Sequence, residues 1–175
     1  MAETAATINL ASGLKADRKL DMVFVDVGTN STPDWEILGR GVEDASVNYN
    51  HDTNQTTDVL GITDVEVSPA KPELDLDPCT IRGGQKLSAK LLDIERRNAI
   101  SELGQFDILH VHCYLSESTS ATAYTAELHK GCTIVPQSLG GSSYVGLPMN
   151  VYLSNDKTLG TVTITDGKPT FTAEE

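Results

Sequence analysis

Two histidines, His110 and His112, have the clearest potential for chemistry in this chain and lie in the stretch DILHVHCYL. Side chains two positions apart on a β-strand share one face, so the two imidazoles could bind the same metal ion. The sequence places no third ligand beside them, and Cys113 points to the opposite face. We therefore interpret the pair as half-buried or interfacial histidines. A metal-dependent enzyme that uses both of them and a carboxylate is kept as an alternative.

Three further motifs favour structure over chemistry. Asp75 and Asp77 form a DxD pair, but they belong to a regular strand alternation, which indicates a solvated face. The glycines of IRGGQK and LGGSSYVG lack the spacing of a phosphate-binding loop or of a serine nucleophile turn. No nucleophile is accompanied by a base and an orienting group, so we expect no enzyme activity, no metal and no cofactor.

Composition and charge narrow the class of protein. Thirteen basic and 25 acidic residues give a formal net charge of −12, which argues against a grip on nucleic-acid phosphates or anionic membranes. No apolar run is long enough to span a membrane, and the N-terminus lacks the features of a secretory signal. The three cysteines show no metal-binding spacing, so we expect buried free thiols in a reducing cytoplasm.

Most of the chain has the pattern of short strands separated by turns. Strands are expected at 22–28, 35–38, 45–49, 58–67, 73–77, 107–115, 121–128, 132–139 and 144–153, followed by a hairpin that turns at Asp166-Gly167. One helix is expected from Gln85 to about Leu103, because Leu87, Leu91 and Ile94 recur at helical spacing. The sequence therefore predicts a mainly β fold, a β-sandwich or partial barrel with one flanking helix at about 85–103.

The polar stretch NHDTNQTTD, at 50–58, has no core-forming residue, and we expect it to project as a loop between two strands. In those strands the apolar phase should pack on the core, while the polar phase should face water. The apolar phase comprises Ala45, Val47, Tyr49, Val65 and Val67, and the polar phase comprises Asp44, Ser46, Asn48, Asp64 and Glu66. The whole chain, 1–175, is expected to form one domain, with an N-terminal arm at about 1–20.

From Trp35 to about Asn98 the sequence resembles the major tail tube proteins of long-tailed bacteriophages, which are similar to the tube proteins of contractile tails and type VI secretion systems. Four segments carry the resemblance in the order of that family, namely WEILGRGVEDASVNYN, NHDTNQTTDVLGITDVEV, PAKPELDLDPCTIRGGQKLSAKLLDIERRNA and FDILHVHCY. The C-terminal third agrees more loosely. Within the sequence given, we expect no appended C-terminal Ig-like domain of the kind that some relatives carry.

The resemblance implies a structural subunit of a virion tail, made in the host bacterial cytoplasm. Subunits of this family form six-membered rings that stack into a tube whose lumen conducts DNA during ejection. The expected partners are further copies of the chain and the tail initiator or baseplate, tape measure and tail terminator proteins. No membrane anchor is expected, and DNA should pass without specific binding.

Two groups of residues acquire roles from this resemblance. The polar loop would contact the neighbouring ring, through Asn50, His51, Asp52, Asn54, Gln55 and Asp58. The strands flanking the loop would form a hairpin that lines the lumen, with Asp44, Ser46, Asn48, Asp64 and Glu66 facing inward. An acidic lumen would repel the DNA phosphates rather than trap them. A monomeric β-sandwich domain for binding or adhesion remains the alternative.

Overall fold

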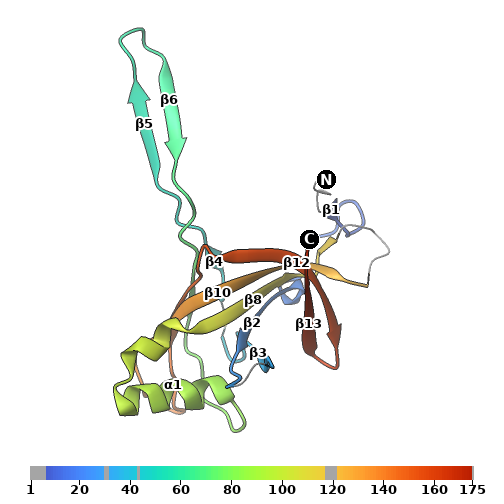
Figure 1. Ribbon diagram of the computed structural model, residues 1–175, viewed down its shortest axis with the longest axis vertical. Coiled ribbons are helices and arrows are strands. Elements are labelled where there is room, and N and C mark those ends of the chain that lie inside the picture. The colour runs from blue at the N-terminus through green and yellow to red at the C-terminus, as the bar shows by residue number, and fades with distance from the viewer. Residues whose placement is uncertain (1–6, 30–31, 43, 117–121, 175) are drawn as a thin grey trace.

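The computed structural model describes residues 7–29, 32–42, 44–116 and 122–174. Figure 1 shows a curled half-barrel sheet with a helix at one end of the long axis and a projecting two-stranded hairpin at the other. This arrangement confirms the mainly β fold with one flanking helix. Residues 1–6 of the expected N-terminal arm lie outside the described residues, and the rest of it contains only the short strand β1 (Thr7–Ile8) and a 3₁₀ turn, Arg18–Leu20.

The main sheet is antiparallel and runs in the order β3 (Trp35–Ile37), β2 (Asp21–Asp26), β8 (Phe106–His112), β10 (Tyr124–Pro136), β11 (Met149–Tyr152), β7 (Glu73–Leu76) and β4 (Val47–Asn48). A second branch leaves β10 through β12 (Lys157–Thr165) and ends at β13 (Lys168–Ala173). Strand β13 comes back into contact with β3, so this branch curls toward closure. The remaining short strand, β9 (Leu115–Ser116), pairs with β1.

Strand β10 joins two segments that the sequence analysis treats as separate strands, 121–128 and 132–139. Residue 121 lies outside the described part of the chain. A bulge between His129 and Cys132, with Gly131 at a φ of 65°, lets one long strand serve both branches of the sheet. The sequence analysis places a break between two strands around Gly131. In the structure this position is a bulge inside one continuous strand. The turn at Asp166-Gly167 joins β12 to β13 as expected, with positive φ at both residues.

Two apolar clusters fill the two faces of the sheet. One face of β2 and β8 contributes Val25 and Ile108 to a core that the helix and β7 cover. The other face contributes Phe24 and Leu109 to a second core inside the curl of β12 and β13. The alternation of β7 is as expected, because Leu74 and Leu76 are fully buried. Cys113 and Cys132 are buried thiols, and Cys79 is half-buried.

The helix α1 (Lys86–Arg97) is shorter than expected. It ends because Asn98 takes a left-handed conformation (φ 54°) and its backbone N–H bonds back to the carbonyls of the last turn. Residues Ile100–Gly104 form a 3₁₀ turn rather than a continuation. The first turn is capped from a distance, because Glu36 Oε2 accepts hydrogen bonds from the backbone N–H groups of Lys86 (2.8 Å) and Leu87 (3.2 Å).

The expected polar loop at 50–58 is largely a strand. Strand β5 (Thr53–Thr57) pairs with β6 (Thr63–Val67) in a separate two-stranded sheet. The strands that flank the segment do not pair with each other, since β4 pairs with β7 instead. The expected pairing of 45–49 with 58–67 in one hairpin is therefore wrong, and the polar segment is itself one arm of the hairpin. Threonines have high β propensity, which a composition-based loop assignment overlooks.

Candidate functional site

The hairpin β5–β6 stands clear of the body of the molecule (Figure 1). Every residue of both strands is exposed. Val65 and Val67 alternate with Asp64 and Glu66 as expected, but neither phase packs on a core. The expectation that the apolar phase packs on the core is therefore wrong for Val65 and Val67, and the hairpin presents two solvent faces. It is also wrong for Tyr49, but Ala45 and Val47 do pack against the main core.

The two faces of the hairpin differ in chemistry. Directly opposed residues of an antiparallel pair share a face. Asn54 lies opposite Glu66 and Thr56 opposite Asp64, which makes one face polar and acidic. The other face carries Gln55 opposite Val65, and it continues through Thr53 opposite Val67 and Thr57 opposite Thr63, which makes a mixed apolar and hydroxyl surface.

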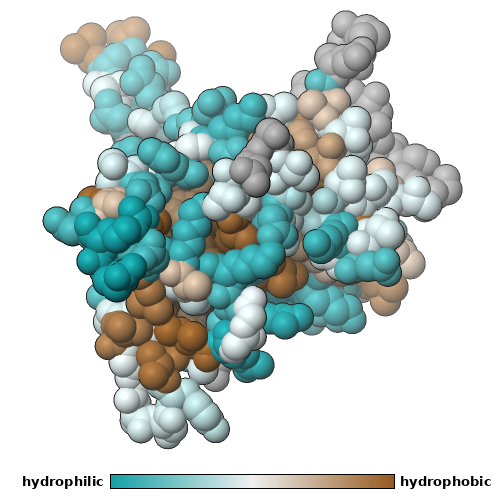
Figure 2. All heavy atoms as spheres, turned by 60° about the horizontal axis from the view of Figure 1, so that its bottom comes forward, coloured by the Kyte–Doolittle hydropathy of each residue, from teal (hydrophilic) through white to brown (hydrophobic). Residues whose placement is uncertain are grey.

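The tip of the hairpin is a turn organised by Asp58. Its Oδ1 accepts hydrogen bonds from the backbone N–H groups of Leu60 (2.8 Å) and Ile62 (2.9 Å), and Gly61 has a φ of 82°. This turn holds three apolar side chains in water, with Val59 102%, Leu60 80% and Ile62 58% exposed. Figure 2 shows them as an apolar cap at the far end of the hairpin, at the upper left. The apolar tip escaped the sequence analysis, because Val59 and Ile62 were assigned to a returning strand.

The stem of the hairpin is tied together by side chains from both arms. His51 Nδ1 donates to the Ser68 carbonyl (2.9 Å), and Lys71 Nζ lies 2.5 Å from Asp52 Oδ2. The hydrogen bond from Lys71 lowers the pKa of Asp52. Asn50, with a φ of 48°, turns the chain into the stem. These contacts fix the direction in which the hairpin leaves the body.

The residues expected to face inward fall into two groups. Asp44, Ser46 and Asn48 are exposed along the body, where Asp44 Oδ1 accepts from the Ser46 hydroxyl at 2.6 Å. Asp64 and Glu66 lie on the hairpin. The structure therefore does not bring the five into one hairpin, although each of them is solvated as the alternation indicates.

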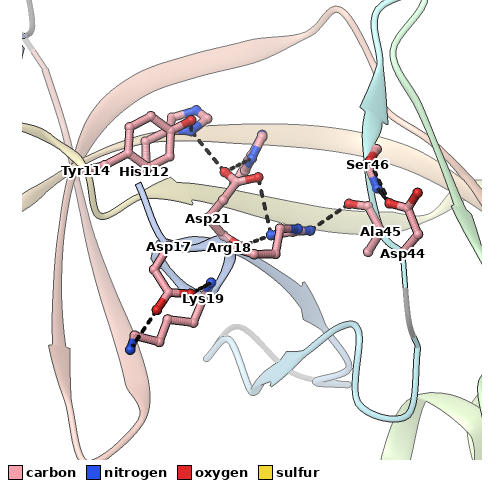
Figure 3. Close-up of polar contacts among 10 residues, drawn as sticks. Asp17, Arg18, Lys19, Asp21, Asp44, Ala45, Ser46, His112 and Tyr114 are labelled. Carbon is pink, nitrogen blue, oxygen red and sulfur yellow. Dashed lines mark hydrogen bonds and ion pairs between the residues drawn. The ribbon is translucent and has the colours of Figure 1, made fainter. Parts of the chain in front are cut away.

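A polar cluster occupies the same sheet face as the main core, beyond the end of that core. Asp21 lies directly opposite His112 in the β2–β8 pairing. His110 lies opposite Val23, and its side chain is on the same face of the sheet as those of Asp21 and His112. Asp21 Oδ1 is 2.8 Å from His110 Nε2 and 3.3 Å from His112 Nδ1 (Figure 3). The structure thus supplies the carboxylate that the sequence could not place beside the two histidines.

Further polar groups continue this cluster along β10. His129 Nδ1 donates to the Ser154 carbonyl (2.7 Å), while its buried Nε2 faces Glu127 Oε2 at 3.4 Å without hydrogen-bond geometry. The contact with His129 lowers the pKa of Glu127 more than burial raises it, and the ammonium of Lys157 lowers it further. Together they hold the pKa of Glu127 at about 2. A cavity of about 240 Å³ lies between these side chains and Tyr49.

Comparisons of the sequence with known proteins do not assign the chain to a family. No protein-family model matches the chain, and no curated protein matches it. Among the described residues, no helix is both long and apolar enough to cross a membrane.

Solved structures give weak similarities. One is the sheath/tube terminator of an extracellular contractile injection system (11% identity, TM-score 0.47, covering 85% of this chain and 99% of that one). Another is the tube-terminating cap of the anti-feeding prophage (15%, 0.46, 87% and 95%). A third comes from the sheath–tube complex of an extracellular contractile injection system (13%, 0.45, 95% and 96%). None of these three structures is a tail tube protein of a long-tailed phage. Similarity at this level does not define what the chain does.

Proposed function

We propose that this chain is a structural subunit of a phage-like tail, which assembles through its projecting hairpin into stacked six-membered rings that form a tube. The observation that carries this proposal is the exposed apolar tip on a hairpin in which every residue of both strands is exposed. A two-stranded hairpin is at best marginally stable alone in water. A neighbouring subunit would cover the tip and supply the missing contacts.

Strand edges support the same proposal. Among the described residues, the sheet path ends at β3 and β4, and β13 pairs with β12 while contacting β3 without strand pairing. Exposed edges present unpaired backbone groups that favour pairing with another chain. The hairpin extends along the long axis of the subunit (Figure 1). In the proposed tube, closing a ring would satisfy the strand edges laterally, and the hairpin would contact the next ring. Heterologous contacts of this kind continue along an axis and build a tube.

The charge of the chain fits a conduit for DNA. The net charge is −12, and the exposed acidic groups Asp44, Asp64 and Glu66 are our candidates for a lumen wall. An acidic or neutral wall lets a polyanion slide, whereas a basic wall would hold it through phosphate contacts. In this role the chain needs no catalytic turnover. It would lie in the virion tail with the tail initiator or baseplate, tape measure and terminator proteins as further partners.

Shortening the hairpin tests the proposal. Replacing residues 56–64 by an Asn-Gly turn keeps the pairing of Gln55 with Val65 and removes the apolar tip. We expect the variant to retain the circular dichroism spectrum and melting temperature of the wild type, because the removed residues contact no core. It should remain monomeric in analytical ultracentrifugation at concentrations where the wild type assembles. Assembly equal to the wild type would refute the hairpin contact, whereas a wild type that stays monomeric at every concentration would favour the alternative of a monomeric binding domain.

A further inference from the structure

Three side chains that carry possible metal-ligand atoms converge where the start of β2 pairs with the end of β8. The donor atoms of Asp21, His110 and His112 all lie within 4.8 Å of one another. The two imidazoles are almost buried, with 6% and 10% of their side chains exposed, and the Asp21 side chain is 24% exposed. The centroids of the two imidazole rings are 4.1 Å apart. One nitrogen of each ring contacts the same carboxylate oxygen, Asp21 Oδ1.

We propose that Asp21 Oδ1, His110 Nε2 and His112 Nδ1 bind one Zn²⁺-class divalent ion. Imidazole nitrogens and a carboxylate oxygen are the donors that such ions take in proteins, at about 2.0–2.2 Å. Tetrahedral donors at that distance lie about 3.3 Å apart. The separation of 3.3 Å between Asp21 and His112 meets this value. The hydrogen bond of 2.8 Å between Asp21 and His110 would have to open by about 0.5 Å to admit the ion.

Sheet pairing makes this set of donors rigid. The ligands sit on two adjacent strands in the fixed register Asp21↔His112 and Val23↔His110. The faces of β2 and β8 that carry them also carry Val25 and Ile108, which are fully buried in the main core. Ligands on strands whose neighbouring side chains are packed lose little conformational freedom on binding, which favours a preformed site.

Surrounding groups orient the ligands. Arg18 Nη1 donates to the Asp21 carbonyl (2.6 Å) and lies 3.5 Å from Oδ2, so the guanidinium faces the carboxylate oxygen that the ion does not use (Figure 3). Tyr114 Oη lies 3.2 Å from His112 Nδ1, within reach of a fourth coordination position or of a water that fills it. The Arg18 charge weakens binding, and the overall charge of −12 opposes that effect.

An ion at this place would clamp the start of β2 to the end of β8. It would hold the N-terminal arm, which enters β2 directly through Arg18–Leu20, against the sheet. This role is independent of the proposed assembly, because none of the three ligands lies on the hairpin. It also departs from the expectation of no metal, which rested on the missing third ligand.

The test uses the full-length protein, stripped with a chelator and titrated with Zn²⁺ by calorimetry and with Co²⁺ by absorption. We expect one ion per chain, a Co²⁺ spectrum of nitrogen and oxygen ligation without a thiolate charge-transfer band, and a melting temperature that rises with Zn²⁺ concentration. Asp21→Asn, His110→Gln and His112→Gln should each weaken binding at least tenfold. His129→Gln, on the same face outside the three ligands, should bind as the wild type does.

Three outcomes would overturn the site. They are no stoichiometric binding by the wild type, a thiolate band that assigns the ion to cysteine, and binding that persists when both His110 and His112 are replaced. Circular dichroism establishes whether each variant keeps its fold. Asp21→Asn preserves the size of the side chain, so it decides the question if a histidine variant does not fold.

Discussion

Replacing the three apolar residues of the hairpin tip, Val59, Leu60 and Ile62, by serine should abolish assembly without unfolding the subunit. The three side chains have exposed fractions of 102%, 80% and 58%. Complete burial of one such side chain contributes about 1.5–3 kcal/mol, so covering all three in an assembly contributes roughly 4–7 kcal/mol per contact. Serine at each position loses most of that amount. Since about 1.4 kcal/mol is a tenfold change in affinity, assembly should require at least about a hundredfold higher concentration.

The assay is sedimentation of the purified protein over a concentration series, which gives the concentration at which polymer first forms. Surface substitutions away from packed features change the stability of a subunit by only about 0.5 kcal/mol, so thermal unfolding of the variant should match the wild type. The matched control is Asp58→Ala, which keeps the apolar residues but removes the acceptor that orders the turn. It should impair assembly less than the triple substitution. An unchanged critical concentration in the triple variant would refute the reasoning.

Three further outcomes are expected. Changing Asp64 and Glu66 to Lys should leave folding and assembly intact, because both side chains are exposed. Phage carrying both changes should eject DNA slowly, and higher salt should relieve the defect because it weakens phosphate contacts. Ejection at the wild-type rate would show that these residues do not line the lumen. Leu91→Ala in the fully buried helix face should lower the free energy of unfolding in urea by about 2–5 kcal/mol, and a loss below 1 kcal/mol would mean that the helix packs loosely. Asn98→Ala should cost about 1 kcal/mol while Asn98→Gly should be neutral, because the position is left-handed; equal melting temperatures for the two variants would contradict that account of the helix end.

Local patterns in the sequence were sufficient for most of the fold. The alternation around Leu74 and Leu76 and the helical spacing of Leu87, Leu91 and Ile94 correspond to buried faces in the structure. These signals follow directly from the geometry of strands and helices. The end of the helix was missed because Asn98 is a weaker stop signal than glycine, and the apolar residues that follow it continue the helical pattern.

Signals that depend on tertiary pairing were not readable. The hairpin β5–β6 buries nothing, so its polar arm lacks the apolar alternation by which strands are recognised. The other arm, β6, was expected as a strand but was paired with 45–49, whereas β4 pairs with β7, 25 or more positions away in the sequence. Asp21 escaped notice for the same reason, since it meets His110 only through the β2–β8 register, 89 positions away.

Electron microscopy of the purified protein at rising concentration tests the central claim most directly. We expect rings and tubes, with density for the hairpin β5–β6 inserted between one ring and the next and its apolar tip covered. Tubes in which the hairpin projects into solvent would contradict the proposed contact. A chain that stays monomeric at every concentration, also with tail initiator proteins present, would contradict the assignment to a tail tube.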